Sequence, residues 1–140
     1  MSTEPQAAIK GRFIDNRDGT VTDTKTNLMW IKNGWRLDFV SAVTWWEAIK
    51  KCETFRLGGH SDWGLPTKEE WNSLIDTARQ CPALVEPNPF ENIIVHMPYW
   101  SKSDLAKYPI QAYTVMLYSG NVNHQNKKDP AFILPVRSID

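Results

Sequence analysis

Two capping boxes in the middle of the sequence constrain the fold more than any other feature. Thr44 stands three residues before Glu47, and Thr67 stands three residues before Glu70. In such a pair each side chain accepts a hydrogen bond from the other residue's backbone N–H, which satisfies free donors at a helix N-terminus. Apolar residues at steps of three and four follow each box, so the sequence predicts two amphipathic helices.

The two expected helices have well-marked faces and ends. The buried face of the first consists of Trp45, Ala48, Ile49, Cys52 and Phe55. The buried face of the second consists of Trp71, Leu74, Ile75 and Ala78. Glycine readily adopts the left-handed conformation that ends helices, so Leu57-Gly58-Gly59 is expected to end the first helix, and Pro82 closes the second segment.

The part before the helices has the character of antiparallel strands. Asp18-Gly19 lies between two short β-prone runs, which predicts a hairpin because glycine tolerates the positive φ of such turns. A second turn at Lys25-Thr26-Asn27 leads into a buried strand at 28–31, and Gly34 begins a loop that runs to about Ser41.

The part after the helices is again β-prone. Residues 80–97 hold three prolines and are expected to form a long ordered loop. Strands are expected at 98–101, 111–117 and 132–137, with a turn at Ser119-Gly120-Asn121 and a polar loop from His124 to Pro130. The order of elements predicts an α+β fold in which two helices pack on a twisted antiparallel sheet with long loops.

Length and charge narrow the classes of function. With 140 residues, the chain has the size of one domain, which we assign to residues 10–140 after a flexible lead-in at 1–9. The 16 basic and 16 acidic residues cancel, which argues against a nucleic-acid binder, and no run approaches the roughly 18 apolar residues of a membrane span. Seven tryptophans are a heavy aromatic load that serves either the core or a binding surface.

Metal and cofactor sites are not expected. Cys52 and Cys81 lack the spacing of zinc or redox pairs, so they are either one disulfide or two reduced thiols. His60, His96 and His124 are scattered without ligand spacing. The signatures of serine or cysteine nucleophiles are also absent from the sequence, so no catalytic residue is predicted.

Several phrases, taken in order, are similar to one family. They are Phe13-Ile14-Asp15-Asn16-Arg17-Asp18-Gly19-Thr20-Val21-Thr22-Asp23, Leu28-Met29-Trp30, Leu57-Gly58-Gly59-His60-Ser61-Asp62-Trp63-Gly64-Leu65-Pro66-Thr67-Lys68-Glu69-Glu70, Tyr99-Trp100-Ser101, Ser119-Gly120-Asn121-Val122 and Pro135-Val136-Arg137. From about Phe13 to the C-terminus the chain resembles the Lcl C-terminal domain family, also catalogued as domain of unknown function 1566. The resemblance implies a C-type-lectin-like fold in a mostly bacterial, often exported family. Its founding example is the tip of an adhesin that binds sulfated host glycans. No catalytic residues are agreed for the family.

The chain departs from the family pattern near its end. Many members carry a cysteine after Val-Arg that plausibly bonds the one on the first helix, and here Ser138 takes that position. Cys81 could replace the missing partner, but we favour Cys52 as a reduced core residue, because unpaired cysteine packs as a small apolar group. This weakens the case for an oxidising compartment.

Short motifs have structural interpretations that outweigh the functional ones. We expect Trp63 to fill the core and Tyr99-Trp100-Ser101 to be core sheet rather than a ligand platform. Glu86-Pro87-Asn88 is similar to the calcium-dependent sugar motif of C-type lectins. The Trp-Asn-Asp companion of that motif is missing from the later strand, so we interpret the match as chance.

The candidate binding residues lie on the polar connections of the late sheet. They are Lys102, Lys107, Tyr108, Gln111, Asn121, Asn123, His124, Gln125, Asn126, Lys127 and Lys128. Amides and ammonium groups can hydrogen-bond sugar hydroxyls or sulfates, Tyr108 could stack on a sugar ring, and Lys127-Lys128 would pair with an anion. The alternative is an ordinary solvated loop.

These observations lead to three hypotheses of function. The first is a non-enzymatic, lectin-like or adhesin-like domain that binds a glycan, anionic or not, or a protein surface. The second is a structural module of a homo-oligomer or a cell-surface complex. The third and weakest is an enzyme of unrecognised type. The location is periplasmic or extracellular if an export signal was removed, and cytoplasmic otherwise.

Overall fold

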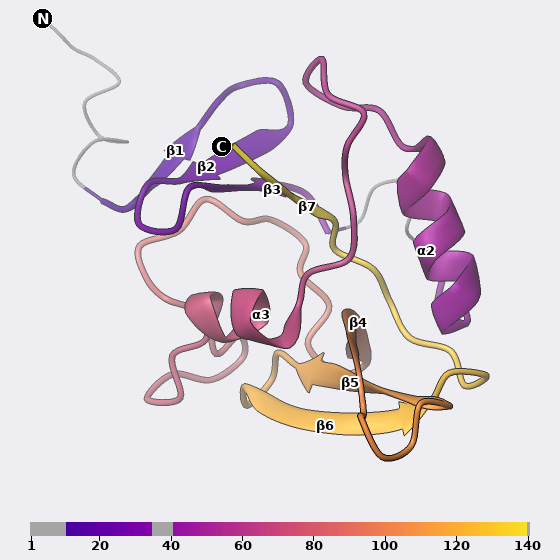
Figure 1. The fold of residues 1–140 in the computed structure, drawn as a ribbon. Helices are drawn as coiled ribbons and strands as arrows, with labels where there is room; N and C mark the ends of the chain where they lie inside the picture. Colours follow the sequence, from indigo (N-terminus) through magenta and orange to yellow (C-terminus); the bar gives the residue numbers. More distant parts are fainter. Residues whose placement is uncertain (1–10, 35–40, 140) are drawn as a thin grey trace, which may run out of the picture.

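The fold is α+β, with two helices and two antiparallel sheets (Figure 1). The computed structural model describes residues 11–34 and 41–139. The predicted lead-in at 1–9 and residues 35–40 of the predicted loop after Gly34 lie outside the described residues. The single predicted sheet is wrong, because the strands divide between two sheets.

The first sheet joins the two ends of the described chain. It consists of β1 (Phe13–Asp15), β2 (Thr20–Asp23), β3 (Leu28–Ile31) and β7 (Val136–Ser138), in the order β1-β2-β3-β7, all antiparallel. The predicted hairpin is confirmed, with Gly19 at a φ of 91°. The second predicted turn is confirmed as well, and there Asn27 has a φ of 58°.

The second sheet contains β4 (Pro98–Asp104), β5 (Gln111–Met116) and β6 (Asn121–Asn126), in that order and antiparallel. The polar loop predicted from His124 is partly wrong, because β6 pairs with β5 over six residues and ends only at Asn126. The last predicted strand is also displaced. Its regular part starts at Val136 and pairs with β3 of the first sheet.

Both predicted helices are present and both capping boxes form. In α2 (Trp45–Thr54) and α3 (Lys68–Leu74), the capping threonine accepts from the N3 backbone and the N3 glutamate accepts from the cap backbone. Thr67 Oγ1 accepts from the Glu70 N–H at 3.1 Å, for example. The local sequence therefore fixes where each helix begins.

The ends of the helices differ from the predictions. Helix α2 stops at Thr54 with Phe55 already extended, so Gly58, at a φ of 62°, belongs to a later turn. Helix α3 stops at Leu74, because Ile75 is extended and bridges to Leu84, which competes with continued helix. Ala78, predicted on the buried face of this helix, is exposed beyond it.

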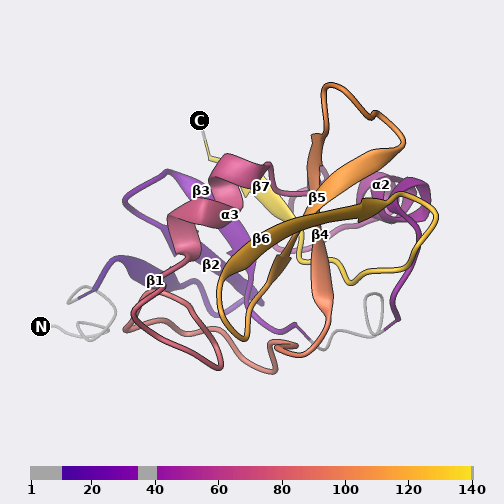
Figure 2. The same ribbon diagram turned by 90° about the horizontal axis from the view of Figure 1, so that it is seen from below.

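Aromatic residues hold α3 between the two sheets (Figures 1 and 2). The ring of Trp71 on α3 lies 5.5 Å from Trp30 of β3 and 5.4 Å from Tyr99 of β4, centroid to centroid. All three side chains are almost completely buried. The indole N–H of Trp71 donates to the carbonyl of Trp100 at 3.0 Å, so the polar atom is satisfied inside the core.

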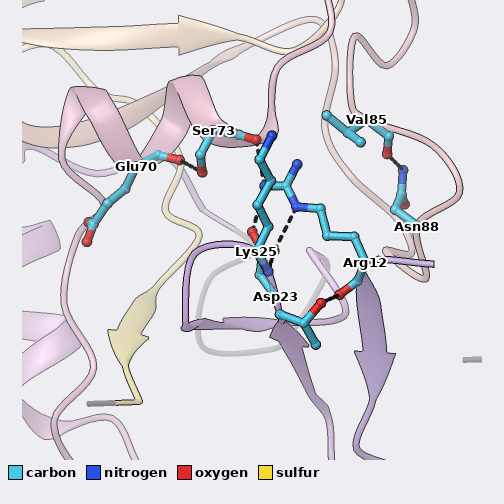
Figure 3. A network of polar contacts seen from close by, with 8 residues as sticks. Arg12, Asp23, Lys25, Glu70, Ser73, Val85 and Asn88 are labelled. Atoms are coloured by element: carbon cyan, nitrogen blue, oxygen red, sulfur yellow. Dashed lines mark hydrogen bonds and ion pairs between the residues drawn. The ribbon is translucent and has the colours of Figure 1, made fainter. Parts of the chain in front are cut away.

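A buried ion pair joins the first hairpin to the end of α3 (Figure 3). The Arg12 guanidinium donates two hydrogen bonds of 2.7 Å to the Asp23 carboxylate and a third of 2.7 Å to the carbonyl of Ser73. The Asp23 side chain is fully buried and that of Arg12 is 14% exposed. This contact stabilises the position of β1 and β2 against the helix.

Candidate functional site

The structure separates the predicted binding residues into distinct places. Strand β6 forms the free edge of the second sheet, at the lower border of the molecule in Figure 1. Because side chains alternate along a strand, His124 lies on one face of the sheet and Asn123 on the other. The polar residues of β6 therefore do not form one continuous surface.

One face of β5 and β6 carries a compact group that we call the Tyr113 patch, made of Lys68, Gln111, Tyr113 and His124. The Lys68 ammonium lies 4.3 Å from the centroid of the Tyr113 ring. Tyr113 and His124 are register partners, and their rings meet edge to face at 6.5 Å. The side-chain oxygen of Gln111, Oε1, lies 2.6 Å from His124 Nδ1.

The chemistry of the Tyr113 patch follows from these contacts. A carbonyl oxygen only accepts, so with the Gln111 amide in this orientation Nδ1 of His124 donates and Nε2 stays available. Lys68, the first residue of α3, has no carboxylate partner within the described part of the chain. The patch therefore offers an imidazole nitrogen and an aromatic ring beneath a cation that no carboxylate of the described residues neutralises.

The crevice beneath the patch is too narrow for a water molecule. It lies between Lys68 and Trp71 on one side and Tyr113, Val115 and Val122 on the other, and its accessible volume is about 0 Å³. The patch is therefore a shallow platform and not a pocket.

Lys127 differs from the exposed lysine that the sequence analysis expected. Its side chain is 8% exposed, and its ammonium lies 4.0 Å from the Trp45 ring centroid and 3.1 Å from an Asp104 carboxylate oxygen. Its backbone also donates to the carbonyl of Ile110 and accepts from the N–H of Trp45. Lys127 thus joins α2 to the connections of the second sheet, and its charge is already paired.

A second group of predicted residues lies around the β4–β5 connection. Tyr108 is 61% exposed, and Lys107 is exposed beside it. Lys128 is exposed on the connection after β6, next to Lys127, whose N–H bonds the β4–β5 connection at Ile110. These residues are available to a partner, but within the described residues they make no side-chain contact with the Tyr113 patch.

The remaining predicted residues lie apart from both groups. Lys102 is exposed on β4 and donates from its backbone to the carbonyl of Pro66 at 2.6 Å. Asn121 opens β6 at the end opposite to His124, and Asn123 occupies the other face of the strand. Gln125 donates to the backbone carbonyls of Asp129 and Pro130, so its amide shapes the following turn.

The sequence segments around Asp62 and Arg137, which carry part of the family resemblance, have structural roles. The Arg137 guanidinium bonds the Asp62 carboxylate at 2.6 Å, and Gly64 and Val136 exchange two backbone hydrogen bonds of 2.9 Å. Trp63 is 4% exposed, as expected for a residue that fills the core. These contacts attach the segment between the helices to β7.

Several groups with shifted pKa values have structural roles. The hydrogen bond from Arg137 lowers the pKa of Asp62. Burial opposes ionisation of Asp23, but the hydrogen bonds from Arg12 and its neighbours outweigh it, so the pKa of Asp23 is lowered. Burial raises the pKa of Cys52 to about 12 and that of Tyr99 to about 12.

The segment Glu86-Pro87-Asn88, which is similar to a calcium-dependent sugar motif, forms local hydrogen bonds. The Asn88 amide donates to the carbonyl of Val85 at 2.8 Å, and its oxygen accepts from the N–H of Phe90 at 3.0 Å. Across residues 11–34 and 41–139, no group of three or more His, Cys, Asp or Glu side chains is placed to hold a metal ion. Glu86 and Asn88 are thus occupied by the turn in which they lie.

Cys52 is buried and Cys81 is exposed, and both thiols are free.

None of the helices in the described ranges has the length and apolar character needed to cross a membrane.

Sequence reasoning missed Lys68 and Tyr113 as site residues. Lys68 was part of a capping box, and Tyr113 was one residue of an expected strand. Only the packing of α3 against β5 brings them together, and neither position carries a local signal of that contact.

Comparison with known families gives one match. The model of the Lcl C-terminal domain family matches residues 19–137, most of the chain, so the chain belongs to this family. No curated protein matches the chain.

Proposed function

We propose that this Lcl C-terminal domain is a non-catalytic, C-type-lectin-like binding domain whose ligand is an anionic glycan, held at the Tyr113 patch. The observation that carries the proposal is the Lys68 ammonium, 4.3 Å from the Tyr113 ring centroid and without a carboxylate partner in the described residues. The apolar face of a sugar packs on an aromatic ring, and a sulfate or carboxylate on that sugar pairs with the cation.

The other members of the patch suit the hydroxyl groups of a sugar. His124 Nε2 accepts a hydrogen bond from a hydroxyl when the ring is neutral, and Gln111 fixes the tautomer through Nδ1. A rigid pair of strands supports these side chains, so little ordering is needed on binding. Tyr108, Lys107 and Lys128 are candidates for additional contacts with a longer chain.

Binding of a sulfated oligosaccharide, measured by isothermal titration calorimetry, tests the proposal. Lys68→Gln removes the cation and keeps a polar side chain of similar length. We expect an affinity weaker by about ten- to a hundredfold, since a hydrogen bond to a charged group contributes about 1.5–3 kcal/mol. Lys50→Gln is the matched control, because it removes an exposed lysine on α2 that belongs neither to the patch nor to the candidate secondary contacts, and its affinity should change less than about twofold.

Two further comparisons separate a charge effect from a loss of folding. A desulfated oligosaccharide should bind more weakly to the wild type, and added salt should weaken the sulfated ligand because exposed charges are screened. Equal affinities of Lys68→Gln and Lys50→Gln would contradict the proposal. So would an equal affinity for the sulfated and desulfated sugars.

A second candidate function is self-assembly through the exposed apolar residues of the β4–β5 connection. Tyr108 is 61% exposed and Ile110 is 45% exposed, close together in the sequence. Paired exposed apolar side chains are typical of contact surfaces. Light scattering over a range of concentrations tests this, with Tyr108→Ser/Ile110→Ser as the variant: a wild-type oligomer that dissociates in the variant supports assembly, and a monomeric wild type contradicts it.

A further inference from the structure

A cavity of about 330 Å³ lies in the segment between α3 and β4 and shares no residue with the Tyr113 patch. Its walls are mainly apolar: Pro82, Leu84, Phe90, Ile93 and Val95, with Cys81 beside them. Ligand pockets in proteins start at about 300 Å³ and are lined mostly by apolar side chains with few polar groups. The cavity therefore has the size and lining of a site for a small ligand.

The two polar residues of the lining have their main partners in the protein. Asn88 bonds the backbone of Val85 and Phe90 through both ends of its amide (Figure 3 shows the bond to Val85). The Asn92 amide donates to the Asn33 side-chain oxygen at 3.1 Å. The lining contains no Lys, Arg, Asp, Glu or His. The lining therefore favours an uncharged ligand over an ion.

The walls of the cavity are fastened to the rest of the fold. Backbone hydrogen bonds join the segment to neighbouring parts of the chain, among them Ala83 N–H to Leu117 O, Cys81 N–H to Tyr118 O, Val85 N–H to Leu74 O and Tyr118 N–H to Val95 O, at 2.7–3.1 Å. A long segment without regular structure is uncommon in a compact domain unless it has a function. Here the fastening keeps the cavity open before any ligand arrives, which lowers the entropic cost of binding.

Backbone conformation sets the shape of the rim. Cys81 has a φ of 54° and Asn92 a φ of 54°, both in the left-handed region. Asparagine tolerates this region, whereas for cysteine it is an uncommon conformation held in place by its surroundings. Cys81 is exposed and belongs to the lining, so its thiol can be labelled next to the cavity.

We propose that this cavity binds a small, uncharged, apolar molecule that carries a ring or a branched chain. The apolar walls supply the binding energy through removal of the ligand's surface from water. A sugar is a poor fit because the walls are mainly apolar and both asparagine amides are engaged, and an ionised metabolite is a poor fit because the lining holds no charged group. The proposal is independent of glycan binding at the Tyr113 patch.

Indole is the probe that we would use, with glycerol as the polar control. Iodoacetamide modifies Cys81, and a ligand in the cavity should block that thiol. The rate should fall about tenfold when the indole concentration is ten times its Kd, because only the empty protein reacts. In amide NMR spectra, indole should shift the resonances of Ile93 and Val95, and glycerol should change neither the rate nor the spectrum.

Filling the cavity provides the decisive variant. Ile93→Trp should abolish protection by indole, and Ile110→Trp, which adds the same side chain on an exposed connection, should preserve it. If Ile93→Trp does not fold, Val95→Phe takes its place. Unchanged labelling rates and unchanged wild-type spectra with indole would overturn the proposal, and so would full protection in a folded Ile93→Trp protein.

Discussion

Replacing Arg12 by methionine should destabilise the protein strongly without touching the proposed sites. The substitution keeps an unbranched apolar stem and removes all three hydrogen bonds of the guanidinium, two to Asp23 and one to the Ser73 carbonyl. The Asp23 carboxylate is then fully buried without its cation. Breaking one side of a buried ion pair costs about 3–5 kcal/mol.

The expected loss is large compared with the whole stability of the domain. A domain of this size unfolds with about 5–15 kcal/mol. The entropy of unfolding, about 2.1 cal/mol/K per residue, makes each kcal/mol worth about 3.4 °C, so Tm should fall by about 10–17 °C. Urea titration followed by tryptophan fluorescence gives the free energy, and differential scanning calorimetry gives Tm.

A double-mutant cycle with Asp23→Asn isolates the pair. That variant loses the charge on Asp23, while Arg12 keeps its bond to the carbonyl of Ser73 and is partly solvated, so its loss should be smaller, about 2 kcal/mol. The double variant should lose less than the sum of the two single variants. A loss below about 1 kcal/mol for Arg12→Met, or strictly additive effects, would refute the reasoning.

The same pair predicts a dependence on pH. The pKa of Asp23 is lowered below its ordinary value of 3.8 in the folded state. Its contribution is therefore fully present above that value and is lost as the pH falls through the lowered pKa. The difference in stability between wild type and Arg12→Met should be largest near neutral pH and shrink below about pH 4. A constant difference down to strongly acid pH would contradict the assignment.

Three further predictions concern single side chains. Near neutral pH, iodoacetamide should add once, at the exposed Cys81, because burial raises the pKa of Cys52 to about 12; two adducts by intact-mass spectrometry would contradict this. Lys127→Met should lower the free energy of unfolding by about 2 kcal/mol, since the buried ammonium lies on the Trp45 ring; an unchanged urea midpoint would contradict that role. Thr67→Ala should cost about 1 kcal/mol through loss of the helix cap, whereas Thr67→Ser should cost much less, and equal thermal midpoints for the two variants would count against the cap.

Local signals predicted the elements that they control directly. Thr44 and Thr67 mark both helix starts because a capping box depends on four consecutive residues. The Asp18-Gly19 hairpin and the strand at 28–31 follow from turn chemistry and apolar runs. The core position of Trp63 followed from its apolar bulk.

Features set by distant partners could not be predicted in the same way. Strand β6 contains three asparagines, a residue type that is depleted in strands, and it is stabilised by pairing with β5. The end of α3 depends on Ile75 bridging to Leu84, and β7 depends on its partner β3. Lys127 looked like part of a solvated pair, but Trp45, far away in the sequence, covers it.

The residues of the proposed site also divide into those that the sequence predicted and those that only the structure brings in. Gln111 and His124 were predicted as binding residues, and the structure places them in contact. Lys68 and Tyr113 joined them only through the packing of α3 on the second sheet. The lysines at 107 and 128 stay candidates for secondary contacts.

Chemical-shift mapping with a sulfated oligosaccharide tests the central claim most directly. Titrated into isotope-labelled protein, the ligand should shift the amide resonances of Lys68, Gln111, Tyr113 and His124 first, with smaller changes around Tyr108. A spectrum that stays unchanged at high ligand concentration, or shifts confined to residues outside the patch, would contradict glycan binding at this face of the sheet.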